Sequence, residues 1–129
     1  GNRIFSSPAG AYPQNSNLTG QVQFGVTSKY QDTSLIGRVN MNFKQANLEF
    51  NSTSLTTLVI SNGQAILRGI GTINGSSNYN FLVTGLGGPQ DTIRFQLKDQ
   101  LGTVVYDSQL GAADTAIPTA FVTGQVIVH

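Results

Sequence analysis

Two Asn-Gly pairs place the tightest limit on how this chain can fold. Asn62-Gly63 and Asn74-Gly75 each lie between segments rich in Leu, Ile, Val and Thr. Both central residues of a two-residue hairpin turn adopt positive φ, so Asn-Gly between such segments is the strongest short-range signal of a β-hairpin. A third connection, Asp99-Gln100-Leu101-Gly102, separates two more runs of β-prone residues. The sequence therefore predicts a meander of antiparallel strands from Leu55 to Gln109.

Alternating apolar and polar residues predict further strands before and within this meander. One strand is expected from Gly20 to Tyr30, and a last one from Thr123 to Val128. Inward-facing side chains are expected at Val22, Phe24, Val26, Val39, Met41, Phe43, Leu48, Phe50, Tyr79, Phe81, Val83, Ile93, Phe95 and Leu97.

Two segments depart from simple alternation. Leu58-Val59-Ile60 is an uninterrupted apolar run, which predicts a strand covered on both faces. Gly69 and Gly71 interrupt the next strand, and glycines there indicate a bulge, a bend or a close neighbour.

No window combines helical periodicity with capping residues. With about nine predicted strands, we expect an all-β fold, an antiparallel β-sandwich of jelly-roll or immunoglobulin-like type. A barrel is the alternative. A chain of 129 residues suits a single domain, so we assign residues 1–129 to one module.

The surface composition indicates a location outside the cell. Charged residues make up only 10% of the chain, against about a quarter in typical soluble domains. Ser, Thr, Asn and Gln supply most of the other polar positions, which is typical of an extracellular or cell-surface module in a larger chain. The net charge is +1 and the cations are scattered, which argues against nucleic-acid binding. No apolar run approaches the about 20 residues of a membrane helix, so we expect no membrane insertion.

The chain offers little for catalysis. It has no cysteine, one histidine at its last position, His129, and one glutamate, Glu49. A Ser-His-Asp arrangement would therefore rest on the chain end, and no two carboxylates stand out as a glycosidase pair. We do not expect an enzyme.

Three aspartates form a candidate metal site. In the register that the Asp99–Gly102 turn predicts, Asp91 and Asp107 lie toward one end of a hairpin, where Asp114 can fold back to join them. Calcium takes several oxygen ligands, so these carboxylates are a candidate calcium site. The alternative interpretation pairs Asp107 with Arg94 directly across the hairpin, an interaction worth about 0.2–1 kcal/mol at a surface.

Tyrosines and amides form a candidate carbohydrate site. Sugar sites on β-sandwiches combine exposed aromatic faces with Asn, Gln, Asp and Arg side chains. Tyr12, Tyr30 and Tyr79 are the candidate ligand-binding aromatics, and the chain has no tryptophan. Packing inside the strand pattern explains Tyr79 and Tyr106 equally well.

Several motifs, in order along most of the chain, resemble the post-COAP domain, a module of long secreted bacterial proteins. The matching segments are Ser7–Tyr12, Phe24–Tyr30, Asn47–Ser54, Leu58–Ile60, Gly69–Gly75, Asp91–Asp99, Gly102–Asp107 and Gly124–His129. This resemblance implies an accessory domain beside immunoglobulin-like, PKD-like and adhesion-type repeats, with no transferable activity. Thr57 and Lys98 stand where that pattern often carries tryptophan, which weakens an aromatic sugar site.

We therefore expect a non-enzymatic extracellular accessory module with a structural or adhesion role. Its expected partners are neighbouring domains of the parent chain, a polysaccharide or a surface protein. The alternative is a carbohydrate-binding module supported by calcium. A spacer should have its termini at opposite ends of the domain and no groove. A binding module should have an exposed cluster of Tyr with Asn or Asp in a groove and should be retarded on a polysaccharide gel.

Overall fold

A computed structural model describes residues 3–124, which form one ten-stranded antiparallel sheet. The strands are β1 (Arg3–Ser7), β2 (Gly20–Gln31), β3 (Ser34–Phe43), β4 (Leu48–Ser61), β5 (Gln64–Ile73), β6 (Ser76–Leu86), β7 (Thr92–Lys98), β8 (Val104–Asp107), β9 (Ala120–Phe121) and β10 (Thr123–Gly124). Two short 3-10 turns, η1 (Pro13–Asn15) and η2 (Lys44–Ala46), lie between strands. Within the described residues, no helix could span a bilayer.

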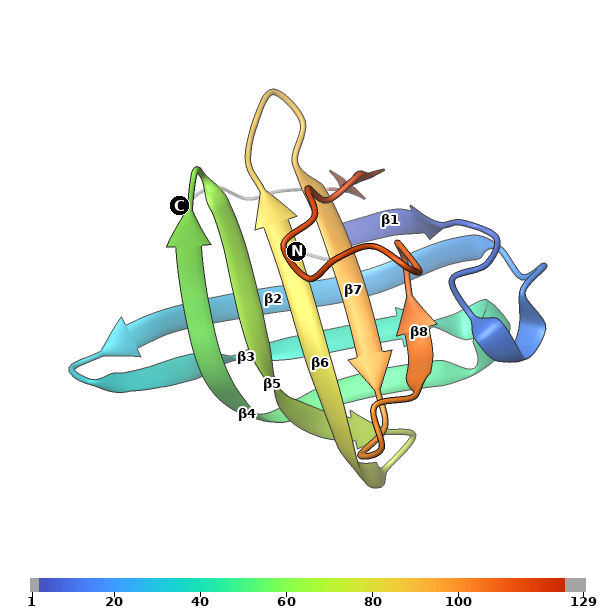
Figure 1. The fold of residues 1–129 in the computed structure, drawn as a ribbon, viewed down its shortest axis with the longest axis horizontal. Helices are drawn as coiled ribbons and strands as arrows, with labels where there is room; N and C mark the ends of the chain where they lie inside the picture. The colour runs from blue at the N-terminus through green and yellow to red at the C-terminus, as the bar shows by residue number, and fades with distance from the viewer. Residues whose placement is uncertain (1–2, 125–129) are drawn as a thin grey trace.

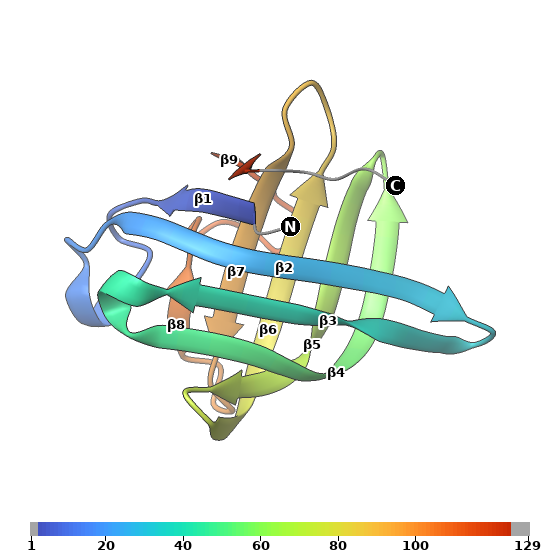
Figure 2. The same ribbon diagram turned by 180° about the vertical axis from the view of Figure 1, so that it is seen from behind.

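The sheet curls into a half-barrel whose two layers cross steeply (Figures 1 and 2). Strands β1 to β3 form one layer, β5 to β8 form the other, and β4 belongs to both. Near the chain end, β9 pairs with β7 and β10 pairs with β1, so this segment links the layers a second time. The predicted all-β antiparallel class is confirmed. One continuous curled sheet replaces the two separate sheets expected of a sandwich, because β4 passes from one layer into the other.

The bend of β4 makes this curl. Its first residues, Leu48–Asn51, pair with β3, and from Phe50 onward the strand pairs with β5 across two register shifts, Ser52/Ser54 and Leu55/Thr57. Such bulges bend a strand and increase its twist. The neighbouring β5 approaches so closely that a Cβ atom on Gly69 would lie 2.3 Å from the Ser54 carbonyl oxygen. Gly71 has the same distance to the Asn51 carbonyl oxygen. The predicted close approach at these glycines is confirmed.

The core lies on the concave side of the sheet and is rich in phenylalanine. The ring centroids of Phe5, Phe24 and Phe95 lie 5.5–6.0 Å apart. Phe50 packs edge-on against Phe81, which joins the two halves of the bend. The alternation predicted for β3 and the start of β4 is confirmed, since all of its inward apolar residues are buried.

The hairpin turns are also confirmed. Asn62 and Gly63 have φ values of 54° and 77°, and Asn74 and Gly75 have φ values of 50° and 83°, as a two-residue turn of this type requires. Of the predicted last strand, residues 123–124 form β10. Residues 125–128 and His129 lie outside the described residues.

Two burial predictions are wrong. The run Leu58–Ile60 is not covered on both faces, because Val59 is 49% exposed and Ile60 is 70% exposed. In β6 and β7 the reverse occurs, because four residues that alternate with the predicted inward positions are also buried: Leu82, Thr84, Arg94 and Gln96. The reason is that residues 108–119 cross the outer face of the second layer and cover it (Figure 1).

The glycines at the bend give a direct test of this architecture. We expect Gly69→Ala to lower the free energy of unfolding by about 1–3 kcal/mol, because its methyl group would overlap the Ser54 carbonyl and the Phe81 ring. Gly85→Ala in β6 is the matched control, since a Cβ atom there meets nothing within 4 Å. Urea unfolding of the three proteins measures the difference. Equal stability of Gly69→Ala and Gly85→Ala would contradict the close approach.

Candidate functional site

The three aspartates predicted to bind calcium do not come together. Each lies beside a different arginine: Asp91 is 3.9 Å from Arg3, Asp114 is 3.5 Å from Arg68, and Asp107 is 2.8 Å from Arg94. In residues 3–124 no group of three or more His, Cys, Asp or Glu side chains is placed to hold a metal ion. The carboxylates therefore act as separate ion-pair partners in this structure.

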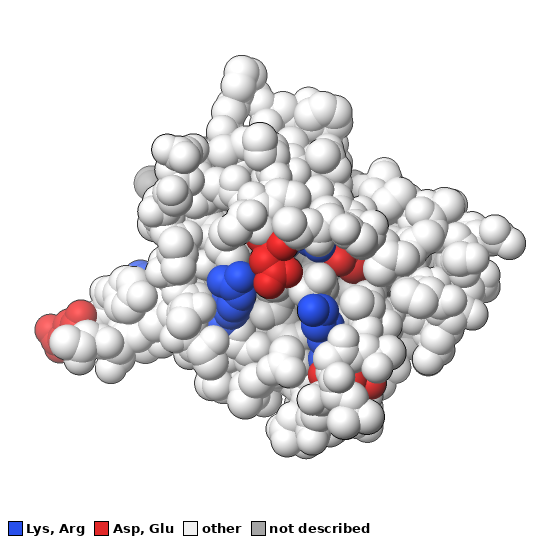
Figure 3. All heavy atoms as spheres, viewed as in Figure 1, with Lys and Arg blue, Asp and Glu red and all other residues white. Residues whose placement is uncertain are grey.

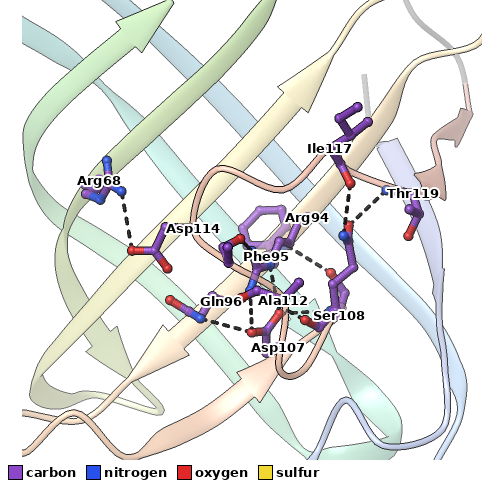
Figure 4. Close-up of polar contacts among 12 residues, drawn as sticks. Arg68, Arg94, Phe95, Gln96, Asp107, Ser108, Ala112, Asp114, Ile117 and Thr119 are labelled. Carbon is purple, nitrogen blue, oxygen red and sulfur yellow. Dashed lines mark hydrogen bonds and ion pairs between the residues drawn. The ribbon is translucent and has the colours of Figure 1, made fainter.

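The Arg94–Asp107 pair is fully buried, not a surface interaction. The two side chains are 0% and 1% exposed. Arg94 Nε donates to Asp107 Oδ1 at 3.0 Å, and Nη2 donates to Oδ2 at 2.8 Å, which makes a two-bond fork (Figure 4). Gln96 Nε2 also donates to Oδ2, at 3.0 Å. Bidentate pairs of this kind are the stronger class of charged hydrogen bond.

The register of this pair differs from the prediction. Asp107 lies opposite Gln96 for two reasons: the turn closes with Asp99 N–H bonded to the Thr103 carbonyl, one residue beyond Gly102, and the ladder between β7 and β8 shifts by one more residue at Leu97/Lys98. Arg94 is two residues from Gln96, so it shares the same face and reaches Asp107 diagonally. The predicted ion pair is therefore present, but the predicted direct opposition of Arg94 and Asp107 is wrong.

The same guanidinium holds the covering segment, residues 108–119, on the sheet. Arg94 donates to the carbonyl oxygens of Ala113 at 2.6 Å and Ala112 at 3.0 Å. From β5, Gln64 donates to the carbonyls of Thr115 and Ala116 at 3.3 and 3.2 Å. These contacts satisfy backbone groups that a loop crossing a sheet would otherwise leave unpaired. This hydrogen-bond network has a structural role, because it holds the covering segment against the outer face of β5 to β8.

The charged groups of this face are few. Figure 3 shows that the Lys, Arg, Asp and Glu side chains visible there gather mainly near the centre, with most of the surface uncharged. The surface pair Arg68–Asp114 lies at the edge of the covering segment, with side chains 38% and 52% exposed.

The candidate tyrosines lie in three separate places. Tyr12 precedes η1 and donates its hydroxyl to Gln14 at 3.0 Å. Tyr30 is 56% exposed near the end of β2, and Tyr79 is half-buried in β6 against the core. The β2–β3 turn and η1 lie at opposite ends of the first layer (Figure 1). No shared aromatic surface results.

Tyr106 is a core residue. It is completely buried, packs edge-on against Phe43 and donates its hydroxyl to Ser7 Oγ at 2.9 Å. Burial raises the pKa of Tyr106 well above its ordinary value. Its role is to join β8 to β1 across the core.

An apolar cleft of about 310 Å³ opens between the two layers. Its walls include Phe24, Val26, Leu58, Leu67, Val83 and Ile93, with Arg3 and Asp91 among the lining residues. The apolar character of these wall residues suits an apolar group better than a sugar.

A polar surface that sequence reasoning did not assemble lies on the outer face of β2, β3 and the start of β4. Register places Gln23 opposite Asn42, and Asn42 opposite Glu49. Two residues before Asn42 in β3, Asn40 lies between Gly25 of β2 and Asn51 of β4. We call Gln23, Asn40, Asn42, Glu49 and Asn51 the amide face.

The amide face is hollowed. A depression of about 280 Å³ is lined by all five of its residues, and an adjoining one of about 370 Å³ is lined by Gln23 and Asn42 together with Lys44 and Gln45. Within the group, Asn51 Nδ2 donates to Glu49 Oε1 at 3.3 Å. The sequence signal for this site was the outward Asn and Gln alternation of each strand. The pairing registers of β2 with β3 and of β3 with β4 bring these side chains together, and alternation within each strand does not determine those registers.

No family model, no curated protein and no solved structure matches this chain.

Replacing the buried Arg94 should lower the free energy of unfolding far more than replacing the exposed Arg68. We expect Arg94→Ala to lower the free energy of unfolding by about 3–5 kcal/mol, because it leaves the Asp107 carboxylate buried without its partner. Arg94→Lys should recover only part of this loss, since an ammonium cannot form the two-bond fork. The control, Arg68→Ala, should cost about 0–1 kcal/mol because that pair is exposed. Chemical denaturation measures the free energy of unfolding of each variant. An equal decrease for Arg94→Ala and Arg68→Ala would contradict the burial of the Arg94–Asp107 pair.

Tyr106 should make the fold sensitive to alkali. Its pKa is raised in the folded protein and is about 10 in the unfolded chain, so the unfolded state loses this proton first. Stability should hold below about pH 10 and fall above it. We expect a shallower alkaline decline in Tyr106→Phe, although its stability at neutral pH falls with the loss of the Ser7 hydrogen bond. Denaturation midpoints from pH 8 to 11 test this, and parallel declines would contradict it.

Proposed function

We propose that this chain is a non-enzymatic, extracellular binding module with an adhesion role, and that its amide face binds a neutral polysaccharide. The observation that carries this proposal is the alignment of Gln23, Asn40, Asn42, Glu49 and Asn51 across three paired strands. The described tyrosines and aspartates offer no comparable gathering of side chains.

The chemistry of the amide face suits sugar hydroxyls. Each amide offers an acceptor oxygen and a nitrogen with two donors, while a hydroxyl needs both kinds of partner. Glu49 adds a carboxylate, which forms stronger hydrogen bonds to hydroxyl groups. The face carries a single formal charge among its five residues, so a neutral polymer fits it better than a polyanion.

The scaffold beneath these side chains is rigid. Met41, Phe43 and Phe50 alternate with the amide residues and are 0–1% exposed on the opposite side of the same strands. A preorganised surface loses less conformational entropy when it binds. The amide face therefore rests on a fully buried part of the core.

The position of the chain ends favours binding over in-line spacing. Arg3 lies opposite Gly124 in the β1–β10 pair, so the described ends of the chain lie side by side. An in-line spacer needs its ends at opposite sides of the domain. With adjacent ends, the module would project from neighbouring domains and leave the amide face open to a partner.

The extracellular location rests on the low charge of the chain and on its resemblance to the post-COAP domain, which also implies neighbouring domains in a parent protein. Calcium has no part in this proposal, because Asp91, Asp107 and Asp114 are each paired with an arginine.

Affinity electrophoresis in gels containing β-glucan, xylan or galactomannan tests the proposal. We expect retardation by at least one of these neutral polymers. Asn42→Ala, at the centre of the face, should weaken binding about tenfold, as expected for the loss of one or two hydrogen bonds.

Asn80→Ala is the matched control, because Asn80 is an exposed amide on β6 in the other layer. It should bind like the parent protein. If no polymer retards the protein, or if Asn42→Ala and Asn80→Ala bind equally, the amide face is not the site.

A further inference from the structure

The outer half of β4 has a neighbour on one side only. From Ser52 onward, β4 pairs with β5, whereas its ladder with β3 ends at Asn51. The Ser52 hydroxyl accepts the Val39 N–H at 2.9 Å, which closes the ladder at that point. The strand then bends into the second layer and runs along its edge (Figure 2). In the described part of the chain, Ser54–Ser61 therefore forms a free edge.

The apolar part of this edge, Leu58–Ile60, lacks the features that usually protect an edge strand. Natural sheets guard their edges with Lys, Pro, bulges, short strands or covering segments. The two bulges of β4 lie before this part of the strand, at Ser52/Ser54 and Leu55/Thr57. No charged residue and no proline occurs between Glu49 and Arg68. The opposite edge of the same layer is treated differently: β8 has four residues, and its Asp107 N–H donates to the Ala11 carbonyl of the β1–β2 connection at 2.9 Å.

The free edge carries an apolar triplet that nothing in the described structure covers. Val59 and Ile60 are 49% and 70% exposed. The ladder with β5 places Leu58 opposite Leu67 on the core side, and Val59 opposite Ile66 on the outer side. Ile60 returns to the side of Leu58, since side chains alternate along a strand.

We propose that this edge pairs with the same edge of a second copy of the chain, in an antiparallel ladder centred on Val59. Two-fold symmetry then sets Val59 opposite Val59 and places Leu58 of each copy opposite Ile60 of the other. Facing residues lie on the same side of the joined sheet, as an antiparallel ladder requires. The layer formed by β4 to β8 in one copy then joins the same layer of the other copy into one continuous sheet.

A second copy fits this edge for two reasons. First, the triplet is complementary to itself under the two-fold axis, the commonest symmetry of protein dimers. Second, the edge has no charge, so two copies meet without like charges opposite one another. The proposal is independent of the amide face, whose central strands β2 and β3 lie in the other layer.

Disulfide trapping tests the predicted register, because the chain has no cysteine of its own. Directly opposed residues in antiparallel strands have Cα atoms about 4.5–5.5 Å apart, which suits a disulfide. Under mild oxidation we expect Val59→Cys to form a covalent dimer at least about tenfold faster than Leu101→Cys. Leu101 is the control because it is 92% exposed and lies in the β7–β8 turn, which β5 and β6 separate from the free edge of β4.

Sedimentation velocity of the unmodified chain over a wide concentration range measures the dimer directly. We expect reversible dimerisation that Val59→Lys weakens at least about tenfold, since the two-fold axis would set two ammonium groups face to face. The thermal melt of Val59→Lys at low concentration confirms that the monomer still folds. A monomer at every concentration, or equal trapping of Val59→Cys and Leu101→Cys, would overturn the proposal.

Discussion

The covered half of this structure depends on one buried guanidinium. Arg94 donates two hydrogen bonds to the Asp107 carboxylate and also donates to the carbonyl oxygens of Ala112 and Ala113. A buried charge is costly unless it is paired and its hydrogen-bonding capacity is used. Arg94 meets both conditions, and in doing so it keeps residues 108–119 on the outer face of β5 to β8. The next residues then enter β9 and β10, which pair with both layers.

The other constraint is the bend of β4. A strand of this length could lie flat, but the bulges at Ser52/Ser54 and Leu55/Thr57 turn it from one layer into the next. Gly69 and Gly71 allow β5 to follow the turn without a side chain between the backbones. The same bend has two functional consequences. It leaves the amide face on the part of the first layer that Met41, Phe43 and Phe50 support from within the core, and it exposes the edge that carries Val59.

The candidate sites show where sequence reasoning reaches its limit. The residue types for carbohydrate binding were visible, but the aromatics chosen as candidates, Tyr12, Tyr30 and Tyr79, lie apart. The amides of β2, β3 and β4 were visible only as outward positions of separate strands. Their alignment depends on the two registers that place Asn42 between Gln23 and Glu49. Likewise, Arg94 and Asp107 were paired from the sequence, but a ladder shift at Leu97/Lys98 and a covering loop determine how they meet.

The sequence by itself determined the all-β class, the hairpins at Asn62-Gly63 and Asn74-Gly75, and the inward faces of β3 and the start of β4. These follow from local physics: the φ values that Asn and Gly tolerate, and the two-residue period of a strand. Only the tertiary structure decided that the sheet curls without dividing, that Arg94 is buried and that Val59 is exposed. The curl depends on where the bulges of β4 fall. The burial of Arg94 and the exposure of Val59 depend on which distant segment covers a strand, and side-chain alternation carries no information about either.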